Sequence, residues 1–172
     1  MADEKVLIVD DDPAIRKLLT KVVENNGFKS MTAANGQEAV ALAQNRKFDL
    51  ILLDIMMNGV DDGFDAIRNL RATGNDIPIV ILSGRTEDFD TLYGLDIGAD
   101  DYITKPFNPV VLGAKIKALI RRNKKAAYNA HNFITAGPFR YSNMTLEFFK
   151  NEQLIPLSSK ENVMMKLFIS NV

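Results

Sequence analysis

Length, composition and charge limit the architectures open to this chain. It has 172 residues, 47% hydrophobic and 25% charged, which is enough for one ordinary domain plus a smaller piece. The absence of cysteine excludes a disulfide scaffold, a thiol nucleophile and a cysteine zinc site. We find no signal-peptide pattern and no apolar run of the roughly 18 residues that span a bilayer. We therefore expect a cytoplasmic protein with no membrane partner.

The charge is divided unevenly along the chain. Residues 1–120 hold 13 Lys and Arg against 19 Asp and Glu, a net of −6, whereas residues 121–172 hold 8 against 3, a net of +5. A basic C-terminal part is expected of a segment that approaches nucleic acid, but a solvated basic linker explains the charge equally well.

The N-terminal part of the sequence alternates between strand-like and helix-like segments. Apolar runs typical of buried parallel strands cover Val6–Val9, Leu50–Leu53 and Ile77–Leu82, with weaker strands at Phe28–Ala33 and Asp101–Ile103. Segments with helical spacing follow at Pro13–Asn26, Gln37–Arg46, Phe64–Ala72, Glu87–Asp96 and Asn108–Arg122. Five βα units with right-handed connections predict a doubly wound, five-stranded parallel α/β domain within residues 1–122.

The sequence changes character after Arg121. The run RRNKKAAYNAHN is polar and basic, and predicts that the last helix frays into a linker over residues 123–136. Residues 137–172 are too few for a convincing independent domain. Their expected elements are short antiparallel strands at Phe139–Tyr141, Thr145–Phe149 and Leu154–Pro156, and a helix at Lys160–Ile169 with its N-cap at Ser158–Ser159.

Polar residues stand where the predicted strands end. Because the carboxyl ends of parallel strands share one edge of a sheet, we expect these residues to lie together. They are Asp10, Asp11 and Asp12 after the first run, Asp54 after the third, Ser83 and Gly84 after the fourth, and Lys105 and Pro106 after the fifth. Several carboxylates in one pocket repel each other unless a cation neutralises them, and an all-oxygen set suits Mg²⁺.

These residue types suit phosphoryl transfer. Asp54 ends a buried run and is a suitable nucleophile for phosphorus, Lys105 pairs with a phosphate oxygen, and Ser83 offers a hydroxyl donor. Gly84 has no side chain, which leaves room for a close approach between its backbone and the phosphoryl group. Taken singly, each has a structural explanation, and helix N-capping accounts for Asp10–Asp12 about as well. Their order at successive strand ends favours the functional interpretation.

Four segments resemble the receiver domain of response regulators: VLIVDDDP, FDLILLDIMMNG, IPIVILSGR and GADDYITKPF. The resemblance covers about residues 4–122 and implies strand order 2-1-3-4-5, as in the chemotaxis member of the family. It also implies that Asp10, Asp11, Asp54 and the Met56 carbonyl hold Mg²⁺. Asp54 would accept a phosphoryl group from a sensor histidine kinase. Such a protein catalyses only its own phosphorylation and dephosphorylation.

The same resemblance identifies the residues that would bind phosphate and change conformation on activation. Ser83 and Lys105 take the positions of the hydroxyl and lysine that bind phosphate, and Tyr102 takes that of the aromatic residue that turns inward on activation. We expect a cis peptide bond before Pro106, by resemblance and because a tight turn must aim Lys105 over the pocket.

The later sequence is similar to the OmpR/PhoB subfamily of transcription factors. The resemblance implies a winged-helix domain preceded by a strand platform, of which residues 137–172 would supply the platform and the first helix only. The full-length protein would bind DNA, and this chain would not. Activation would form a homodimer through the fourth helix, fifth strand and fifth helix. Of the interface positions, Asp101 and Arg122 match the subfamily's charges, whereas Thr91, Val111, Ile97 and Lys115 stand at its other paired positions.

Two departures and two alternatives remain. The family usually has proline at the position of Asn58, and GVDDG is one residue longer than usual before Gly63. A haloacid-dehalogenase-like phosphohydrolase would use Asp10 and Asp12, but it leaves Asp54 unexplained. A receiver that serves only as a protein-interaction module is the other alternative.

Overall fold

The computed structural model describes residues 3–58, 62–84 and 88–171. The chain forms two compact units, Met1–Arg121 and Arg122–Val172, so the division falls within a residue of the expected boundary. In the described part of the chain, no helix combines the length and apolarity required to cross a membrane.

The N-terminal unit contains one parallel sheet with strand order β2-β1-β3-β4-β5. Its strands are β1 (Lys5–Val9), β2 (Lys29–Ala33), β3 (Leu50–Asp54), β4 (Ile79–Ser83) and β5 (Asp101–Thr104). Its helices are α1 (Pro13–Asn25), α2 (Gly36–Asn45), α3 (Asp62–Ala72), α4 (Asp88–Asp96) and α5 (Pro109–Asn132). The predicted fold class and strand order are confirmed. The expected start of α4 at Glu87 lies outside the described residues.

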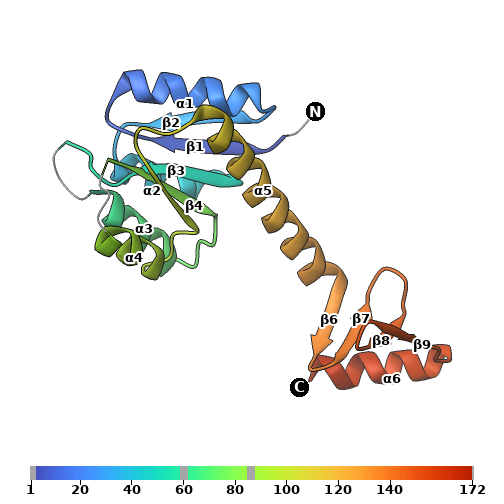
Figure 1. Ribbon diagram of the computed structural model, residues 1–172. Helices are drawn as coiled ribbons and strands as arrows, with labels where there is room; N and C mark the ends of the chain where they lie inside the picture. Colours follow the sequence, from blue (N-terminus) through green and yellow to red (C-terminus); the bar gives the residue numbers. More distant parts are fainter. Residues whose placement is uncertain (1–2, 59–61, 85–87, 172) are drawn as a thin grey trace. The chain divides into compact units, whose positions relative to one another are not determined.

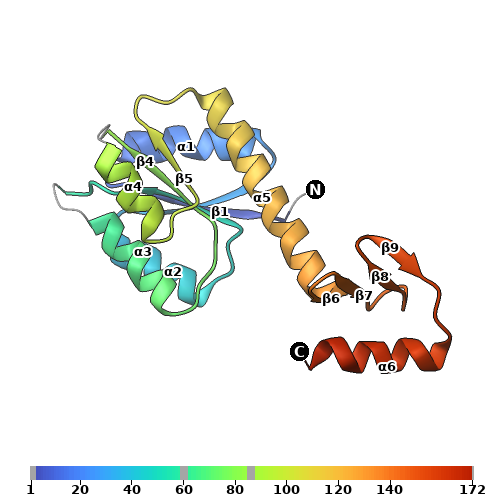
Figure 2. The same ribbon diagram turned by 60° about the horizontal axis from the view of Figure 1, so that its bottom comes forward.

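Helices cover both faces of this sheet (Figures 1 and 2), with α1 and α5 on one face and α2, α3 and α4 on the other. Successive side chains of a strand point to opposite faces, so Val6 and Ile8 pack with α1 and α5, while Leu7 and Val9 pack in the other core. Burial on both faces explains the unbroken apolar runs of β1, β3 and β4.

Local signals set the limits of α1. The Asp12 carboxylate accepts a hydrogen bond from the Ala14 amide at 2.8 Å, and Pro13 occupies the first helical position. Gly27, with φ of 88°, follows the end of the helix. The helix ends at Asn25, one residue before the expected Asn26.

The expected linker over residues 123–136 is wrong. Helix α5 continues to Asn132, and β6 (Phe133–Ala136) follows at once, paired with β7. Polarity suggested fraying, but residues 123–132 contain neither glycine nor proline, and their lysines and alanines are good helix formers.

The C-terminal unit contains an antiparallel sheet of order β6-β7-β8-β9 and one helix. The elements after β6 are β7 (Phe139–Ser142), β8 (Phe148–Lys150), β9 (Gln153–Ile155) and α6 (Ser159–Ser170). Strand β8 is shorter than expected, since Leu146 adopts a left-handed backbone with φ of 59°. A capping box joins Ser158 and Glu161 at the start of α6, which confirms the predicted N-cap.

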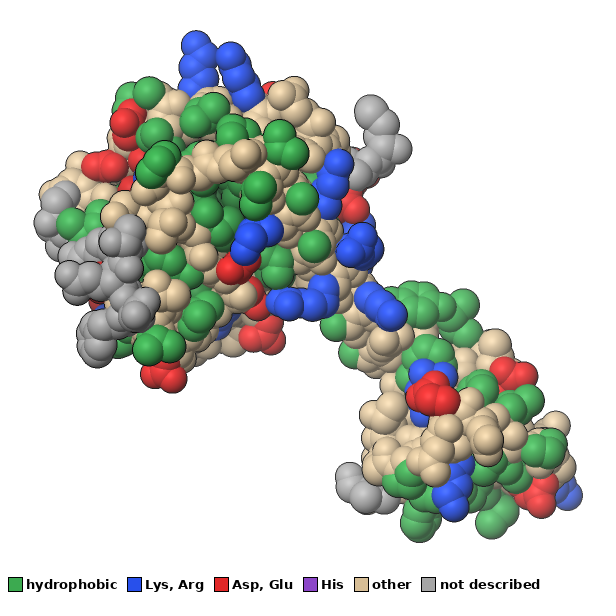
Figure 3. Space-filling view, in the orientation of Figure 1, with side chains coloured by type: hydrophobic (Ala, Val, Ile, Leu, Met, Phe, Trp, Pro, Cys, Tyr) green, Lys and Arg blue, Asp and Glu red, His purple; other side chains and the backbone are tan. Residues whose placement is uncertain are grey.

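One face of this small sheet packs against α6. Tyr141, Phe148 and Ile169 are its fully buried hydrophobic residues. Large apolar side chains of α6 remain exposed, as the hydrophobic surface of this unit in Figure 3 illustrates. They are Val163, Met164, Leu167 and Phe168.

Candidate functional site

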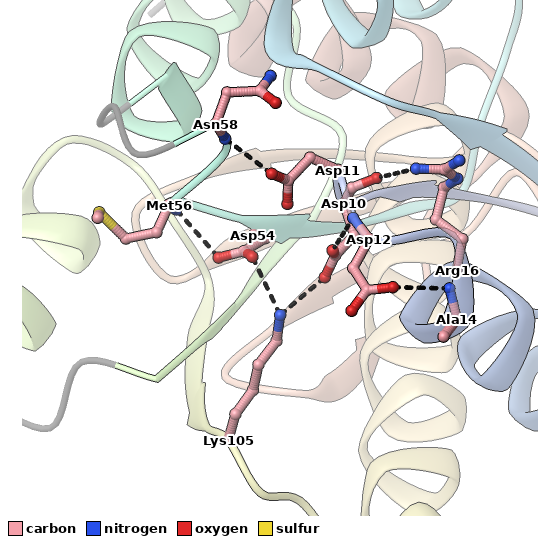
Figure 4. Close-up of polar contacts among 9 residues, drawn as sticks. All are labelled: Asp10, Asp11, Asp12, Ala14, Arg16, Asp54, Met56, Asn58 and Lys105. Carbon is pink, nitrogen blue, oxygen red and sulfur yellow. Dashed lines mark hydrogen bonds and ion pairs between the residues drawn. The ribbon is translucent and has the colours of Figure 1, made fainter.

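The carboxyl edge of the parallel sheet brings the predicted site residues together. Asp10 follows β1, Asp54 ends β3, Ser83 ends β4 and Lys105 follows β5. All four strands run in the same direction, so their ends reach one edge. Figure 4 shows the side chains of Asp10, Asp11, Asp54 and Lys105 converging there.

Three carboxylates form the acidic part of this site. Asp10, Asp11 and Asp54 each offer an oxygen, and these oxygens lie within 4.8 Å of one another. Asp10 is 1% exposed and Asp54 6%, so water screens their repulsion poorly. This all-oxygen set has the chemistry that Mg²⁺ requires.

Lys105 places a positive charge between two of the carboxylates. Its Nζ donates to Asp10 Oδ2 at 2.7 Å and to Asp54 Oδ2 at 3.0 Å. Burial alone would lower the pKa of Lys105, but its hydrogen bonds to Asp10 and Asp54 outweigh burial and raise that pKa. The lysine therefore stays charged at neutral pH.

Burial raises the pKa of Asp54 above its ordinary value. The Met56 amide, which donates to Asp54 Oδ1 at 3.0 Å, and the Lys105 ammonium oppose this effect, while the Asp10 carboxylate adds to it. Burial thus makes Asp54 more basic than an exposed carboxylate, while the Lys105 ammonium holds one of its oxygens at 3.0 Å.

Backbone contacts fix the acidic residues in place. The Asp12 amide donates to Asp10 Oδ1 at 2.9 Å, and Arg16 Nη1 donates to the Asp10 carbonyl at 2.6 Å. The Asn58 amide donates to Asp11 Oδ2 at 2.8 Å (Figure 4). The contacts of Arg16 and Asn58 were not predicted, because neither residue belongs to a strand end or carries a recognisable spacing signal.

Asp12 does not take part in the carboxylate cluster. Its side chain caps α1 through the Ala14 amide, as the N-capping interpretation expected of this residue. The phosphohydrolase alternative requires Asp12 to act as an acid beside Asp10, so this geometry disfavours it.

The main chains of β4 and β5 set the position of Lys105. Its amide donates to the Ser83 carbonyl at 2.7 Å, and the Lys105–Pro106 bond is cis, as expected. Ser83 is fully buried beside this contact. A Cβ atom on Gly84 would meet no atom of the described residues within 4 Å, so their packing does not demand glycine there. Space for a bound phosphate at Gly84 stays a prediction.

The residues flanking the site pack in the core below it. Met57 is 1% exposed, in agreement with a packing role, and Met56 lies partly buried against the same core. Tyr102, the expected switch residue, is also partly buried there. Gly94 of α4 is close to the tyrosine: a Cβ at this position would lie 3.5 Å from Tyr102 and 2.6 Å from Ile81.

Gly63 is a site residue that sequence reasoning missed. A Cβ atom at this position, in the first turn of α3, would lie 2.5 Å from both the Asp54 carbonyl oxygen and Ile55 Cα. Glycine therefore lets α3 approach the backbone of the nucleophile. The only sequence signal was a glycine near a predicted helix start. Residues 59–61 of the unusually long GVDDG stretch lie outside the described residues.

The expected interface residues on α4, β5 and α5 have mixed environments. Asp101 pairs with Lys115 of the same chain at 2.8 Å, and Ile97 is partly buried against the core. Val111 is exposed. Thr91 and Arg122 each have interactions of their own within the chain. The expected charged pairing is thus partly satisfied inside one molecule.

Comparison with known proteins agrees with this geometry. The model of the response regulator receiver domain matches residues 6–117, and the chain therefore belongs to that family. The receiver domain of the Francisella response regulator 1452 superposes with a TM-score of 0.67 and 34% identity, covering 70% of this chain and 99% of that one. The BeF3-activated DrrB receiver domain superposes with a TM-score of 0.62 and 30% sequence identity. The match covers 70% of this chain and 99% of that one.

Longer relatives are named as transcriptional regulators. The probable transcriptional regulator ycf27 of Guillardia theta is 37% identical over 97% of this chain and 66% of its own length. YvrH of Bacillus subtilis is 36% identical over 98% of this chain and 71% of its own length. PhoP of Bacillus subtilis, named as the alkaline phosphatase synthesis transcriptional regulatory protein, is 42% identical over 73% of this chain and 52% of its own length. The chain thus spans between half and 71% of these relatives.

Proposed function

We propose that this protein is a phosphorylation-controlled response regulator in which Asp54 is the phosphoacceptor. The observation that carries the proposal is the Lys105 ammonium, which lies 3.0 Å from Asp54 and 2.7 Å from Asp10. It holds a charge beside the nucleophile, where an incoming phosphoryl oxygen requires one. Response regulators interact with histidine kinases, so the donor is a phosphohistidine in the cytoplasm.

The reaction is a displacement at phosphorus. A carboxylate oxygen of Asp54 attacks the phosphorus atom and forms a P–O bond, while the P–N bond to the donor imidazole breaks. The leaving nitrogen keeps the electron pair and takes a proton from water. The products are an aspartyl phosphate and a neutral histidine. Lys105 then pairs with an oxygen of the transferred group.

Asp10, Asp11, Asp54 and the Met56 carbonyl would hold Mg²⁺. The ion would supply positive charge that lowers the repulsion between the carboxylates and an anionic phosphoryl group. The residues around it orient the nucleophile: the Met56 amide fixes one oxygen of Asp54, and Gly63 lets the first turn of α3 lie against its backbone.

The bound phosphoryl group would bias a two-state switch. Ser83 would donate its hydroxyl to a phosphoryl oxygen, Gly84 would offer its amide, and Tyr102 would turn further inward as the serine moves. Tyr102 lies on β5 and packs beside α4, so the change reaches the α4–β5–α5 face.

The altered face would form a homodimer. Leu92, Leu95, Val110 and Val111 are exposed on α4 and α5 and supply apolar surface for association. Because Asp101 already pairs with Lys115, charged pairs across the interface would be fewer, and each exposed pair contributes only about 0–1 kcal/mol. Analytical ultracentrifugation with and without beryllofluoride should reveal activation-dependent dimers. Monomers in both samples at high concentration would contradict this interface.

We assign transcription regulation to the whole protein by analogy with its named relatives. The C-terminal unit, a four-stranded platform followed by α6, would form the start of a winged-helix DNA-binding domain. A stand-alone interaction module remains the second candidate, and the sequence downstream of Val172 in the open reading frame separates the two.

Intact-mass measurement tests the phosphoacceptor directly. Incubation with acetyl phosphate and Mg²⁺ should add one phosphoryl group, which hydroxylamine removes. Asp54→Asn should abolish the labile addition. Asp12→Ala is the control that leaves it in place, because it removes the side chain that caps α1 and keeps the amide that donates to Asp10. Magnesium-dependent, hydroxylamine-sensitive labelling that persists in Asp54→Asn would refute the assignment.

A further inference from the structure

Asn58 makes an unusual contact with the acidic cluster. Its backbone adopts a left-handed conformation with φ of 53°, which non-glycine residues rarely adopt and asparagine tolerates best. In this conformation its main-chain N–H donates to Asp11 Oδ2 at 2.8 Å, joining residues 47 positions apart. In Figure 4 the Asp11 carboxylate lies between Asn58 and the pair of Asp10 and Asp54.

We propose that Asn58 is a positioning residue for the metal site, acting through this hydrogen bond to Asp11. The inference rests on the proposed function, because it assumes that Asp11 binds the cation. A carboxylate on an open loop rotates freely unless a donor fixes one of its oxygens. The Asn58 amide fixes Oδ2 and leaves the other oxygen available to the ion.

The reason for asparagine at this position is the combination of two requirements. The contact seen in this chain needs a free N–H and a left-handed backbone at residue 58. The proline that the family usually has there lacks the N–H, and its ring at φ near −65° cannot adopt that backbone, so it could not make this contact. Partners that orient a metal ligand typically change metal affinity by about 10–100-fold when they are removed. We expect the lower end of this range, because Asp10 and Asp54 retain their own contacts.

The test is a Mg²⁺ titration followed by the amide NMR signals of Asp10, Asp11 and Ile55 in the full chain. Asn58→Pro removes the donor and the backbone conformation together, and should weaken Mg²⁺ binding about tenfold. Asn58→Gly keeps the N–H and favours positive φ, so it should restore affinity to within about threefold of the original. Thermal melts of each variant establish that the fold is retained.

A matched control comes from the C-terminal unit. Asn151 is also left-handed, with φ of 49°, and its amide also donates a backbone hydrogen bond, to the Pro138 carbonyl at 2.9 Å. Asn151→Pro makes the same chemical change far from the carboxylates in sequence and in a different compact unit. It should leave the Mg²⁺ affinity unchanged.

A second readout needs no metal. In Asp11→Ala the Asn58 amide proton loses its acceptor, so its NMR signal should move upfield and exchange faster with water, whereas Asp12→Ala should leave that signal in place. An unmoved Asn58 signal in Asp11→Ala, or unchanged Mg²⁺ affinity in a folded Asn58→Pro, would overturn this inference while labelling at Asp54 still supports the phosphoacceptor. Absence of both Mg²⁺ binding and labelling in the original chain would overturn both.

Discussion

The two units of the chain bury their sheets in different ways. In the N-terminal unit, helices cover both faces of the sheet, and β3 and β4 are buried along their full lengths. In the C-terminal unit, α6 covers one face, and only three large hydrophobic residues among residues 122–171 are fully buried. A sheet held on both faces can carry charged groups at its edge, because neighbouring strands fix their backbones. The hydrophobic core of the small unit is much smaller, so burial stabilises it less.

The largest expected effect is the loss of the C-terminal fold in Phe148→Ala. Truncating a buried phenylalanine costs about 3–5 kcal/mol, and a core of this size rarely supplies more than about 3–5 kcal/mol in total. Hydrogen exchange should show unprotected amides throughout β6–β9 and unchanged protection in β1–β5. Retained protection of β8 would show that the small unit has more stability than its core suggests.

The same kind of truncation in the other unit should be survivable. Leu52→Ala, in the middle of β3, should lower the free energy of unfolding by about 2–5 kcal/mol and leave the unit folded at 25 °C. Urea titration measures this loss. Leu167→Ala on α6 is the comparison: its side chain is exposed, so the change should stay within about 0.5 kcal/mol. Equal losses in the two variants would contradict the contrast in burial.

Lys105→Ala tests whether Lys105 serves phosphoryl transfer and not metal binding. Phosphorylation of Asp54 by acetyl phosphate should slow by about 100-fold, because the variant lacks the fixed cation beside the transferred group. Mg²⁺ affinity should stay within a few-fold, since an ammonium has no lone pair for a cation. Quench-flow kinetics measure the phosphorylation rate, and a Mg²⁺ titration measures the metal affinity. A loss of Mg²⁺ affinity by orders of magnitude would assign Lys105 a different role.

The smallest expected effect concerns the capping box of α6. Ser158→Ala removes the side-chain oxygen that accepts from the Glu161 amide, and should destabilise the C-terminal unit by about 1 kcal/mol. Chemical denaturation followed by an NMR signal of Ile169 measures the change. Ser158→Thr, which keeps the hydroxyl, should recover most of it. If Ser158→Ala left the midpoint unmoved, the cap would not limit the stability of this unit.

Much of the receiver fold could be predicted because its signals are local. Unbroken apolar runs and helical spacing located five strands and five helices to within a few residues, apart from the C-terminal end of α5, and strand ends located Asp54 and Lys105. The extension of α5 to Asn132 was missed, because polarity resembled a linker while helix propensity decided the structure. Gly63 and Asn58 act through backbone approach and a long-range amide contact, which no periodicity reveals.

The single ammonium among three carboxylates has a consequence for ion selection. With all four groups ionised, Asp10, Asp11, Asp54 and Lys105 sum to −2. A divalent ion restores electroneutrality, whereas a monovalent ion leaves one uncompensated charge in a poorly hydrated place. Such a site would discriminate by valence before it discriminates by ionic radius. Abundant K⁺ and Na⁺ would compete weakly, even though each outnumbers any free divalent cation.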